Sequence, residues 1–361
     1  MLIVDAHQDL AWNMLTFERD YTRSAAETRR LERGTEIPNH NGDTLLGWPD
    51  YQRGRVAVIF AAMFAAPIRR RLGTWDLNCY ANPNEAHQRY SAQLDTYHRL
   101  VEQNRDKFRL LTSQADLEEV LTHWHNEQEK EHPVGLTVLM EGAEAIQETV
   151  ELETWWLRGV RIIGPAWAGT RFCGGTREPG ALTKEGFALL EAMAVLGFIL
   201  DISHMDQRAV LQALDTYTSA LIASHSNAAA VIGNTISNRH LSDRVIQGLI
   251  ERDGVIGIVP FNGFLDSDWR PSDGRQVITL QHVIAQIDHI CQIAGNARHV
   301  GLGSDFDGGF GLQMVPAEID TIADLSKLAP LLLEKGYTKT DLSAILADNW
   351  IRKLKNNLPE K

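Results

Sequence analysis

Six residues with metal-binding or acid–base side chains follow short apolar runs in this sequence of 361 residues. In chain order they are His7, Asp9, Glu141, His204, His225 and Asp305. On an extended chain, His7 and Asp9 point to the same side, because side-chain direction alternates along a strand. An imidazole and a carboxylate placed in this way can bind one divalent cation together, and a carboxylate such as Glu141 can bridge two cations. Taken singly, each residue also fits an ordinary role in a polar turn, a helix cap or a buried core.

The apolar runs that precede these residues predict buried strands. The predicted strands are 2–7, 56–64, 136–141, 160–166, 198–203, 221–225, 255–260 and 300–304. Segments with helical periodicity lie between most of them, at 84–105, 114–130, 182–196, 206–215, 241–252 and 279–294. Runs that are apolar on both faces suit parallel strands covered by helices. Eight strand–helix units in succession therefore predict an α/β fold of the (β/α)8, or TIM-type, barrel class.

Three longer segments follow predicted strands, and none of them has the composition of a linker between domains. The segment 18–55 combines charged residues with Gly, Asn and Pro, and it is predicted to be a long loop excursion over the barrel mouth. Segment 168–181 is rich in Gly, and segment 262–278 follows the seventh strand. Residues 317–357 have a helical pattern and are predicted to cover the barrel. We therefore predict one catalytic domain over residues 1–361, with its chemistry in the loops that follow the strands.

All six candidate residues fall at the predicted C-terminal ends of strands, which form the catalytic face of a TIM-type barrel. Three imidazoles and three carboxylates would then converge on one cavity. Unpaired carboxylates beside partly buried histidines are costly, and two divalent cations about 3.5–4 Å apart would relieve that cost. Mixed nitrogen and oxygen ligands favour zinc over magnesium, while cobalt and manganese remain alternatives. The pattern therefore predicts a binuclear metal site.

Composition and charge exclude several other classes of protein. The formal net charge of −12 disfavours nucleic-acid binding, and no apolar stretch approaches the length of a transmembrane helix. The N-terminal residues MLIVDAHQDL lack the basic region of a signal peptide. The three cysteines, Cys79, Cys173 and Cys291, have no paired spacing, which indicates reduced thiols. These features predict a cytoplasmic protein with neither a membrane nor a nucleic-acid partner, and they say little about small-molecule substrates.

The motifs around the six residues resemble those of a known family. In chain order they are DAHQDL, VLMEGAEAI, LDISHMD, IASHSNA, SNRHLSD and GLGSDFDG. This set is similar to the membrane (renal) dipeptidase family of zinc peptidases, which includes soluble bacterial members, and the resemblance extends from residue 2 to about residue 352. It implies a (β/α)8 barrel with two zinc ions per chain. The implied reaction is hydrolysis of the amide bond of dipeptides, including those with a D residue in second position, by a hydroxide that bridges the metals.

The resemblance also assigns roles to individual residues. It implies two metal-binding pairs and one bridging carboxylate: His7 with Asp9, His204 with His225, and Glu141 between them. Arg239 in SNRHLSD matches the family arginine that holds the substrate. Asp305 matches the aspartate that handles the catalytic proton. Members of the family are often dimers, so the resemblance is compatible with a homodimer.

The sequence departs from the family pattern at two positions. Trp167, in the segment RIIGPAWAG, stands where the family dipeptidases have a histidine that contacts the substrate. An indole can donate one hydrogen bond but carries no positive charge. The metals and Arg239 would then stabilise the reacting oxygen, or the substrate differs from a standard dipeptide, or Trp167 simply packs at the barrel mouth. Glu144 replaces a histidine of the animal enzymes and is expected to make the rim of the site more acidic.

These departures keep two alternatives open. The first is a related metal-dependent hydrolase that cleaves another amide, such as an N-acyl amino acid, a lactam or a peptide-like metabolite. The second is a homologue that binds ligands without catalysis, which the complete ligand set and Asp305 disfavour. The C-terminal residues KLKNNLPEK contain no hydrophobic tail for the lipid anchor of the animal members.

Overall fold

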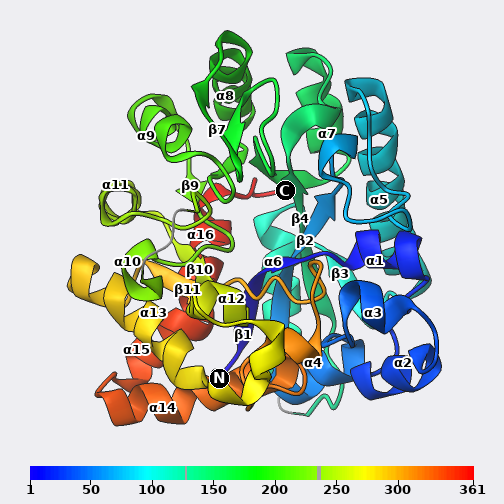
Figure 1. Cartoon of the computed structure of the whole chain (residues 1–361), viewed down its shortest axis with the longest axis vertical. Helices are drawn as coiled ribbons and strands as arrows, with labels where there is room; N and C mark the ends of the chain where they lie inside the picture. The colour runs from blue at the N-terminus through cyan, green and yellow to red at the C-terminus, as the bar shows by residue number, and fades with distance from the viewer. Residues whose placement is uncertain (127, 234–236) are drawn as a thin grey trace.

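Eight parallel strands form a barrel at the centre of the computed structural model, which describes residues 1–126, 128–233 and 237–361 (Figure 1). The strands are β1 (Ile3–Gln8), β2 (Val56–Phe64), β4 (Val134–Glu141), β5 (Val160–Gly164), β8 (Ile199–Asp201), β9 (Leu221–Ile222), β10 (Ile256–Ile258) and β11 (Val300–Leu302). Their order in the sheet is β10-β11-β1-β2-β4-β5-β8-β9, and all of these pairs are parallel. Each predicted strand corresponds to one of them. The predicted fold class, a (β/α)8 barrel, is confirmed.

The barrel closes where β9 approaches β10. Ala223 and Ile256 form a parallel bridge, and the backbone N–H of Gly257 donates to the carbonyl of Ala223 at 2.8 Å. A side chain at Gly257 or Gly303 would lie within 2 Å of the Ser224 carbonyl oxygen, at 1.9 and 1.8 Å respectively. Glycine at these two positions therefore permits the close approach of strands on which closure depends.

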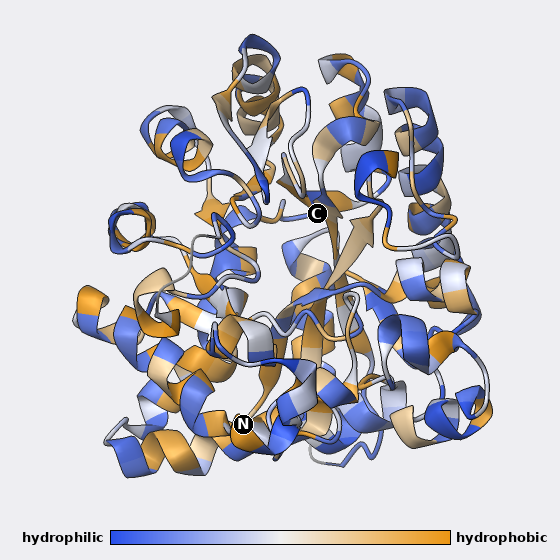
Figure 2. Cartoon of the chain, viewed as in Figure 1, coloured by the Kyte–Doolittle hydropathy of each residue, from blue (hydrophilic) through white to orange (hydrophobic). Residues whose placement is uncertain are grey.

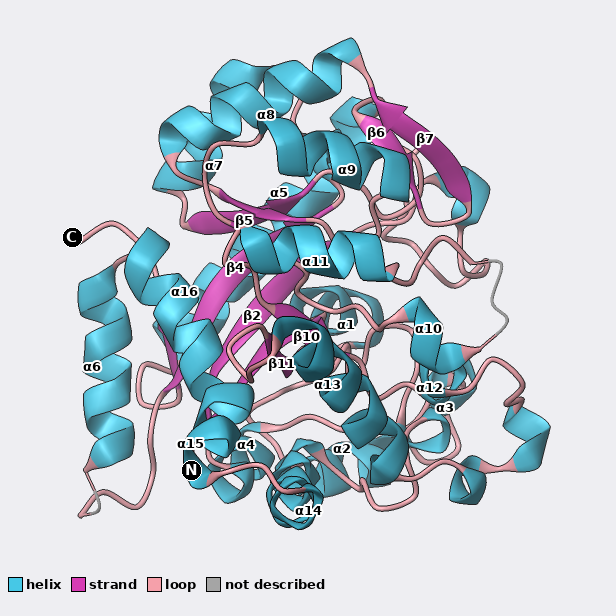
Figure 3. Cartoon of the chain, turned by 90° about the vertical axis from the view of Figure 1, so that its left-hand side faces the viewer, coloured by secondary structure: helices cyan, strands magenta, loops and turns pink. Residues whose placement is uncertain are grey.

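Helices surround the barrel and cover its outer face (Figures 1 and 3). The helices of at least eight residues that follow strands or pack outside them are α5 (Pro83–Gln103), α6 (Gln114–His125), α8 (Lys184–Leu196), α9 (Gln207–Thr216), α11 (Asp243–Glu251), α13 (Leu280–Ala294), α14 (Leu328–Lys335) and α16 (Asn349–Asn357). Short α-helices are α7 (Leu152–Leu157), α10 (Ala229–Ile232), α12 (Asn262–Leu265) and α15 (Lys339–Ser343). Figure 2 shows apolar residues on the strands and on the helix faces. The hydrophobic core therefore lies between the sheet and this ring of helices.

Side-chain caps explain where several of these helices begin. Ser113 and Asp116 form a capping box at the start of α6, and Thr183 accepts a hydrogen bond from the N–H of Gly186 at the start of α8. Such caps satisfy backbone donors that the first helical turn leaves without partners. None of the helices among the described residues is long and apolar enough to cross a membrane.

The segment 18–55 contains three helices, which follow α1 (Leu10–Phe17). They are α2 (Ala25–Glu32), α3 (Ile37–Asn41) and α4 (Trp48–Gly54). Ser24 caps α2, and the carboxylate of Asp50 accepts a hydrogen bond from the N–H of Ala25, so α2 and α4 are fastened to each other. Figure 1 shows α1 to α4 on one side of the barrel.

Two further pieces of sheet were not among the predicted strands. β3 (Phe108–Leu110) pairs with the N-terminal part of β4, outside the barrel order. Within the Gly-rich segment 168–181, β6 (Cys173–Gly175) and β7 (Glu178–Leu182) form an antiparallel hairpin. A side chain at Gly174 would lie 2.0 Å from the backbone nitrogen of Gly180, so the glycines let the two strands approach. The hairpin lies close to α9 (Figure 3), where the side chain of Gln212 accepts from the N–H of Leu182.

The C-terminal segment consists of short helices that end in α16. A 3-10 helix spans Ile322–Lys327, and a π-helical turn, Ala344–Asp348, leads into α16. The indole N–H of Trp350 donates to the carbonyl of Leu302 at 3.0 Å, and the Asn349 amide donates to the carbonyl of Val300 at 2.8 Å. These bonds attach α16 to β11. The remaining 3-10 turns are Ile68–Arg70, Ala143–Ala145, Thr149–Glu151, Pro271–Asp273, Arg275–Val277 and Leu312–Met314.

Candidate metal centre and active site

The six candidate residues meet at the C-terminal ends of the barrel strands. Three overlapping groups each offer ligand atoms within 4.8 Å of one another: His7, Asp9 and Glu141; Glu141, His204 and His225; and His7, His225 and Asp305. Three of the residues lie at the ends of long strands: His7 is near the end of β1, Asp9 directly follows β1, and Glu141 is the last residue of β4. The structure therefore brings together side chains that are up to about 300 residues apart in the sequence.

Glu141 lies between two sets of ligands. Its Oε1 lies 2.9 Å from Nε2 of His204 and 3.3 Å from Nε2 of His225. Its Oε2 lies 3.6 Å from Nε2 of His7, and that nitrogen is 3.7 Å from Oδ2 of Asp9. The two oxygens of one carboxylate thus face two separate groups of residues, an arrangement that allows a carboxylate to bridge two cations.

The donor atoms fit metal ions. Nε2 of His7 and Oδ1 of Asp9 are buried and have no hydrogen-bond partner. Nε2 of His204 and Nε2 of His225 face each other at 2.9 Å. Buried polar atoms without partners are costly, and a divalent cation bound to them removes that cost. The nitrogen and oxygen donors suit zinc and other first-row transition metals.

Hydroxyl groups behind the histidines direct Nε2 toward the cluster. Nδ1 of His204 lies 2.9 Å from Oγ1 of Thr176, and Nδ1 of His225 lies 2.8 Å from Oγ of Ser224. Ser224 in turn donates to Oδ2 of Asp201. Such partners fix the orientation of imidazole ligands in metal sites. The sequence analysis did not single out these three supporting residues, although Asp201 and Ser224 lie inside the motifs LDISHMD and IASHSNA.

The cluster shifts the pKa values of its own members. Burial, aided by Arg239, lowers the pKa of His204 to about 4, and burial also lowers the pKa of His225 well below its ordinary value. Both rings are therefore neutral near pH 7, which is the form that binds metal. Burial opposes ionisation of Glu141, but the charges and hydrogen bonds of the imidazoles outweigh burial and hold its pKa well below the usual range. Burial likewise disfavours charge on His7, but Glu141 and Asp9 raise its pKa.

The pKa of Asp305 is shifted in the direction opposite to that of Glu141. Burial raises the pKa of Asp305 well above its ordinary value, and the nearby carboxylates of Asp9 and Glu141 add to this effect. A raised pKa favours the protonated form of a carboxyl group, which can donate a proton. The pKa values of Asp305 and Glu141 are therefore shifted in opposite directions within one cluster.

Three residues near the cluster have left-handed backbone conformations. The φ angles are 66° for His204, 57° for Asp305 and 64° for Asp307. Such conformations cost about 1–3 kcal/mol each for residues other than glycine and collect at functional sites. Hydrogen bonds to neighbouring residues must therefore stabilise these backbone conformations. For Asp305, one such bond runs from its own N–H to the carbonyl of His7 at 3.1 Å.

Asp307 anchors the loop that carries Asp305. Its carboxylate is fully buried and accepts hydrogen bonds from the Tyr21 hydroxyl at 2.9 Å and the Leu45 N–H at 3.0 Å. It also forms an ion pair with Arg19 at 3.1 Å and accepts from the Thr44 hydroxyl. All four partners lie in the segment 18–55, which thereby holds the loop after β11 in place.

Arg239 is buried beside the cluster. Its guanidinium donates to Oγ of Ser226 at 3.0 Å and to the carbonyl of His225 at 2.6 Å, while its Nε has no partner. It also lies over the ring of Phe264, 5.3 Å from the centroid. The two bonds fix the guanidinium in place and leave N–H donors for a ligand.

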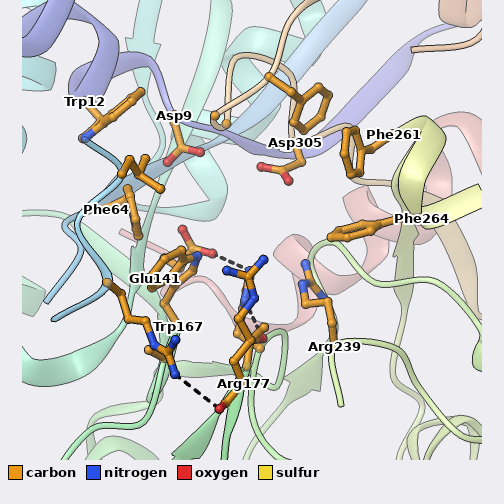
Figure 4. Close-up of a pocket in the computed structure, with 18 of the residues that line it drawn as sticks. Asp9, Trp12, Phe64, Glu141, Trp167, Arg177, Arg239, Phe261, Phe264 and Asp305 are labelled. Carbon is orange, nitrogen blue, oxygen red and sulfur yellow. Dashed lines mark hydrogen bonds and ion pairs between the residues drawn. The ribbon is translucent and has the colours of Figure 1, made fainter. Parts of the chain in front are cut away.

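A cavity of about 300 Å³ opens above the cluster (Figure 4). Two aromatic groups line it: Trp12, Phe64 and Trp167, and on the other side Phe261, Phe264 and Phe310. Trp167 lines this cavity, with its ring 4.9 Å from that of Phe64 and 6.2 Å from that of His204. Arg70, Arg177 and Arg239 supply positive charge. Of these three arginines, the sequence analysis identified only Arg239.

Glu144 does not contribute to this cavity. Its carboxylate pairs with Arg171 at 3.2 Å and lines a separate surface depression that also includes Cys173 and Thr183. The expectation that Glu144 makes the rim of the site more acidic is therefore wrong, because its charge is compensated and lies outside the residues that line the cavity.

Comparison with known proteins identifies the family. The model of the family described as "Membrane dipeptidase (Peptidase family M19)" matches residues 1–358. The chain belongs to this family. The predicted resemblance is confirmed, and membership places the protein among the metallo-dipeptidases.

Several individual proteins are similar to all or part of this chain. An uncharacterised protein from the pqqA 5' region of Klebsiella pneumoniae is 31% identical over 274 residues, which are 73% of this chain and 94% of that protein. An uncharacterised dipeptidase of Schizosaccharomyces pombe is 32% identical over 178 residues, 49% of this chain and 41% of that protein. A metallo peptidase from Rhodobacter sphaeroides, solved with a phosphinate mimic of the dipeptide L-Ala-D-Ala, has a TM-score of 0.77 at 24% identity, over 99% of both chains. The last comparison supports the fold.

Proposed function

We propose that this protein hydrolyses dipeptides, including those with a D residue in second position, with two divalent cations, zinc first among them. The proposed ligands are His7 and Asp9 for one cation, His204 and His225 for the other, and Glu141 for both. The observation that carries this proposal is the position of Glu141, whose two oxygens face two separate ligand sets. The unpartnered Nε2 of His7 and Oδ1 of Asp9 add to it.

The two cations would supply polarisation of the scissile carbonyl and activation of a water molecule at neutral pH. The proton of that water needs an acceptor, and we assign this role to Asp305. A ligand atom of Asp305 lies within 4.8 Å of ring nitrogens of His7 and His225, and its raised pKa suits it to take a proton. The same carboxyl group then gives the proton to the leaving amine.

Arg239 is proposed to bind the carboxylate of the substrate. Its guanidinium lines the cavity, is fixed by Ser226 and His225, and retains an unpartnered Nε–H. The planar fork of an arginine suits a carboxylate better than a point charge does. Trp167 is proposed to form a wall against an apolar part of the substrate, because its ring packs on Phe64 at the edge of the same cavity.

The test combines metal analysis with turnover. Protein reconstituted with zinc should bind two ions per chain and release free amine from a panel of dipeptides with L and D residues in second position. His204→Ala should lose at least one ion and most of the turnover. His240→Ala is the matched control, because His240 is a mostly buried neighbour of Arg239 and belongs to none of the three ligand groups. Two tightly bound ions in His204→Ala would refute the ligand assignment.

A further variant separates the proton carrier from the ligands. Asp305→Asn should keep both metals and lose about 10²- to 10⁴-fold in kcat, the usual contribution of a positioned acid or base. Near-normal turnover of this variant with its metals bound would refute the role of Asp305.

The aromatic lining supports a second candidate substrate class. The two aromatic groups on opposite sides of the cavity would also accept the acyl part of an N-acyl amino acid, with Arg239 on its carboxylate. Hydrolysis of N-acyl amino acids, without hydrolysis of dipeptides by the same zinc-loaded sample, would favour this alternative.

A further inference from the structure

Arg177 occupies the turn of the β6–β7 hairpin with its backbone held on both sides. Its N–H donates to Oδ1 of Asn238 at 2.9 Å, and its carbonyl accepts from Nη2 of Arg70 at 3.4 Å. The residue has a left-handed conformation, with φ of 64°. Asn238 also donates to the carbonyl of Gly175, so the hairpin is tied to the residue that precedes Arg239. The turn is therefore fixed relative to the proposed carboxylate-binding arginine.

The side chain of Arg177 reaches from this fixed turn into the cavity. Figure 4 shows it rising between Trp167 and Arg239, toward Glu141. No carboxylate of the described residues lies within ion-pair distance of its guanidinium. By contrast, Arg69 and Arg70 both pair with Glu178, each at 2.8 Å. Arg177 thus points an uncompensated positive charge into the space where a substrate would bind.

The negative charges of the cavity do not compensate for this cation. The carboxylates among the lining residues are Asp9, Glu141 and Asp305, and all three belong to the candidate metal groups. Cations bound there would neutralise them, which leaves Arg177 and Arg239 as two positive groups that face the substrate. The carboxylate end of a dipeptide can satisfy one of them, so the geometry leaves room for a second anionic group.

We propose that Arg177 selects dipeptides whose C-terminal residue carries a side-chain carboxylate, that is, Asp or Glu. This inference rests on the proposed dipeptidase function and on Arg239 as the partner of the terminal carboxylate. Arg177 then pairs with the side-chain carboxylate, and the aromatic groups of the cavity remain available to the N-terminal residue.

Kinetics with isosteric substrates test the proposal. Ala-Asp is compared with Ala-Asn, and Ala-Glu with Ala-Gln, each with the L and the D form of the second residue. The zinc-loaded protein should cleave the acidic dipeptides with kcat/KM about tenfold or more above their amides, because a charge-assisted pair is lost in the amides. Arg177→Gln should remove this preference mainly through KM, and Arg177→Lys should restore part of it. Arg244→Gln is the matched control, since Arg244 is exposed on α11 and does not line the cavity.

The outcomes separate this inference from the function on which it rests. Equal cleavage of acids and amides would overturn the role of Arg177 and leave the dipeptidase function standing. A uniform loss for both substrates in Arg177→Gln would also overturn it, because Arg177 would then bind the terminal carboxylate. Cleavage of no dipeptide at all would overturn both. Calorimetric binding of the products gives a readout independent of turnover: aspartate should bind more tightly than asparagine to the wild type, and equally to Arg177→Gln.

Discussion

Two walls of the cavity are held in place by opposite kinds of electrostatic contact. On one side, the segment 18–55 grips the loop after β11 through Asp307, whose carboxylate and its partner Arg19 are fully excluded from solvent. On the other side, the β6–β7 hairpin is fastened by Glu178 to Arg69 and Arg70, and the side chain of Arg69 is 54% exposed. The first wall places Asp305, and the second presents Arg177.

This difference in solvent exposure of the ion pairs distinguishes a rigid wall of the cavity from an adaptable one. A buried charge that has all its hydrogen-bond partners resists displacement, because a movement would break these bonds and no water could replace them. Ion pairs at the surface contribute about 0–1 kcal/mol and weaken with salt. We therefore expect the wall that carries Asp305 to be rigid, and the wall that carries Arg177 to adapt to the substrate.

The largest predicted effect comes from the buried anchor. Asp307→Asn should lower the free energy of unfolding by about 3–5 kcal/mol. Arg19 keeps its ion pair with Glu32, but the buried acceptor shared by Arg19, Tyr21 and Thr44 loses its charge, and an amide NH2 group then faces these donors. Urea unfolding followed by circular dichroism measures this loss. Asp43→Asn in the same segment is the control, and it should change stability by about 0.5 kcal/mol or less because its contact with Gln313 is exposed. A loss of that small size in Asp307→Asn would contradict the rigid anchor.

A smaller loss is expected at Asn13, which joins the anchor to the metal cluster. Its amide donates to the carbonyls of Asp9 and Asp307, both at 2.9 Å, and its oxygen accepts from Arg19 and Asn41. Asn13→Ala should cost about 1–3 kcal/mol, because buried donors and acceptors lose their partner. The same unfolding assay applies, and an unchanged midpoint would show that these bonds contribute nothing.

On the opposite wall, Glu178→Gln should affect binding more than stability. The free energy of unfolding should fall by less than about 1 kcal/mol, as for other surface pairs. KM should rise several-fold at constant kcat, because the turn that bears Arg177 loses its fastening to Arg69 and Arg70. Steady-state kinetics and unfolding on the same preparation check both parts. If kcat fell while KM stayed constant, the hairpin would belong to the rigid part of the site.

The smallest predicted effect is a dependence on pH and salt. Hydrogen bonds from Arg69 hold the pKa of Glu178 below its ordinary value and outweigh the effect of burial. The stability that Glu178 contributes is therefore present above the pKa of an unfolded glutamate, about 4.3, and is lost as the pH falls through the lowered value. The stability difference between wild type and Glu178→Gln should vanish at low pH, and also near 1 M salt, where the Debye length is about 3 Å. If the stability difference persisted under these conditions, the ion pairs of Glu178 with Arg69 and Arg70 would behave as buried ion pairs.

The sequence predicted the barrel because its strands are apolar on both faces. The run Val56–Phe64 is apolar throughout and is buried at every position, as expected for a strand covered on both faces. The candidate metal ligands were recognisable because they follow such apolar runs. His204 and His225 stand out as ionisable side chains shortly after the apolar runs 198–200 and 221–223.

Contacts that depend on distant partners could not be predicted in this way. Asp307 is part of the motif GLGSDFDG, but its partners Arg19, Tyr21 and Thr44 lie more than 260 residues away, and no local pattern links them. Arg177 was missed because a Gly-rich segment predicts a loop, whereas facing glycines at 174 and 180 let it pair as a hairpin. The role of Glu144 was predicted wrongly because its partner, Arg171, lies after another strand, β5, and no local pattern links the two residues.

The position of β1 between β11 and β2 has a consequence for synthesis of the chain on the ribosome. Asp5 pairs with Leu302, so His7 and Asp9 emerge among the first residues while Asp305 is among the last. At about 5–20 residues per second, roughly 15–60 s separate the two events. The complete set of six clustered side chains therefore exists only on a nearly finished polypeptide. Closure of the barrel around the candidate metal centre is then a late event in the synthesis of the chain.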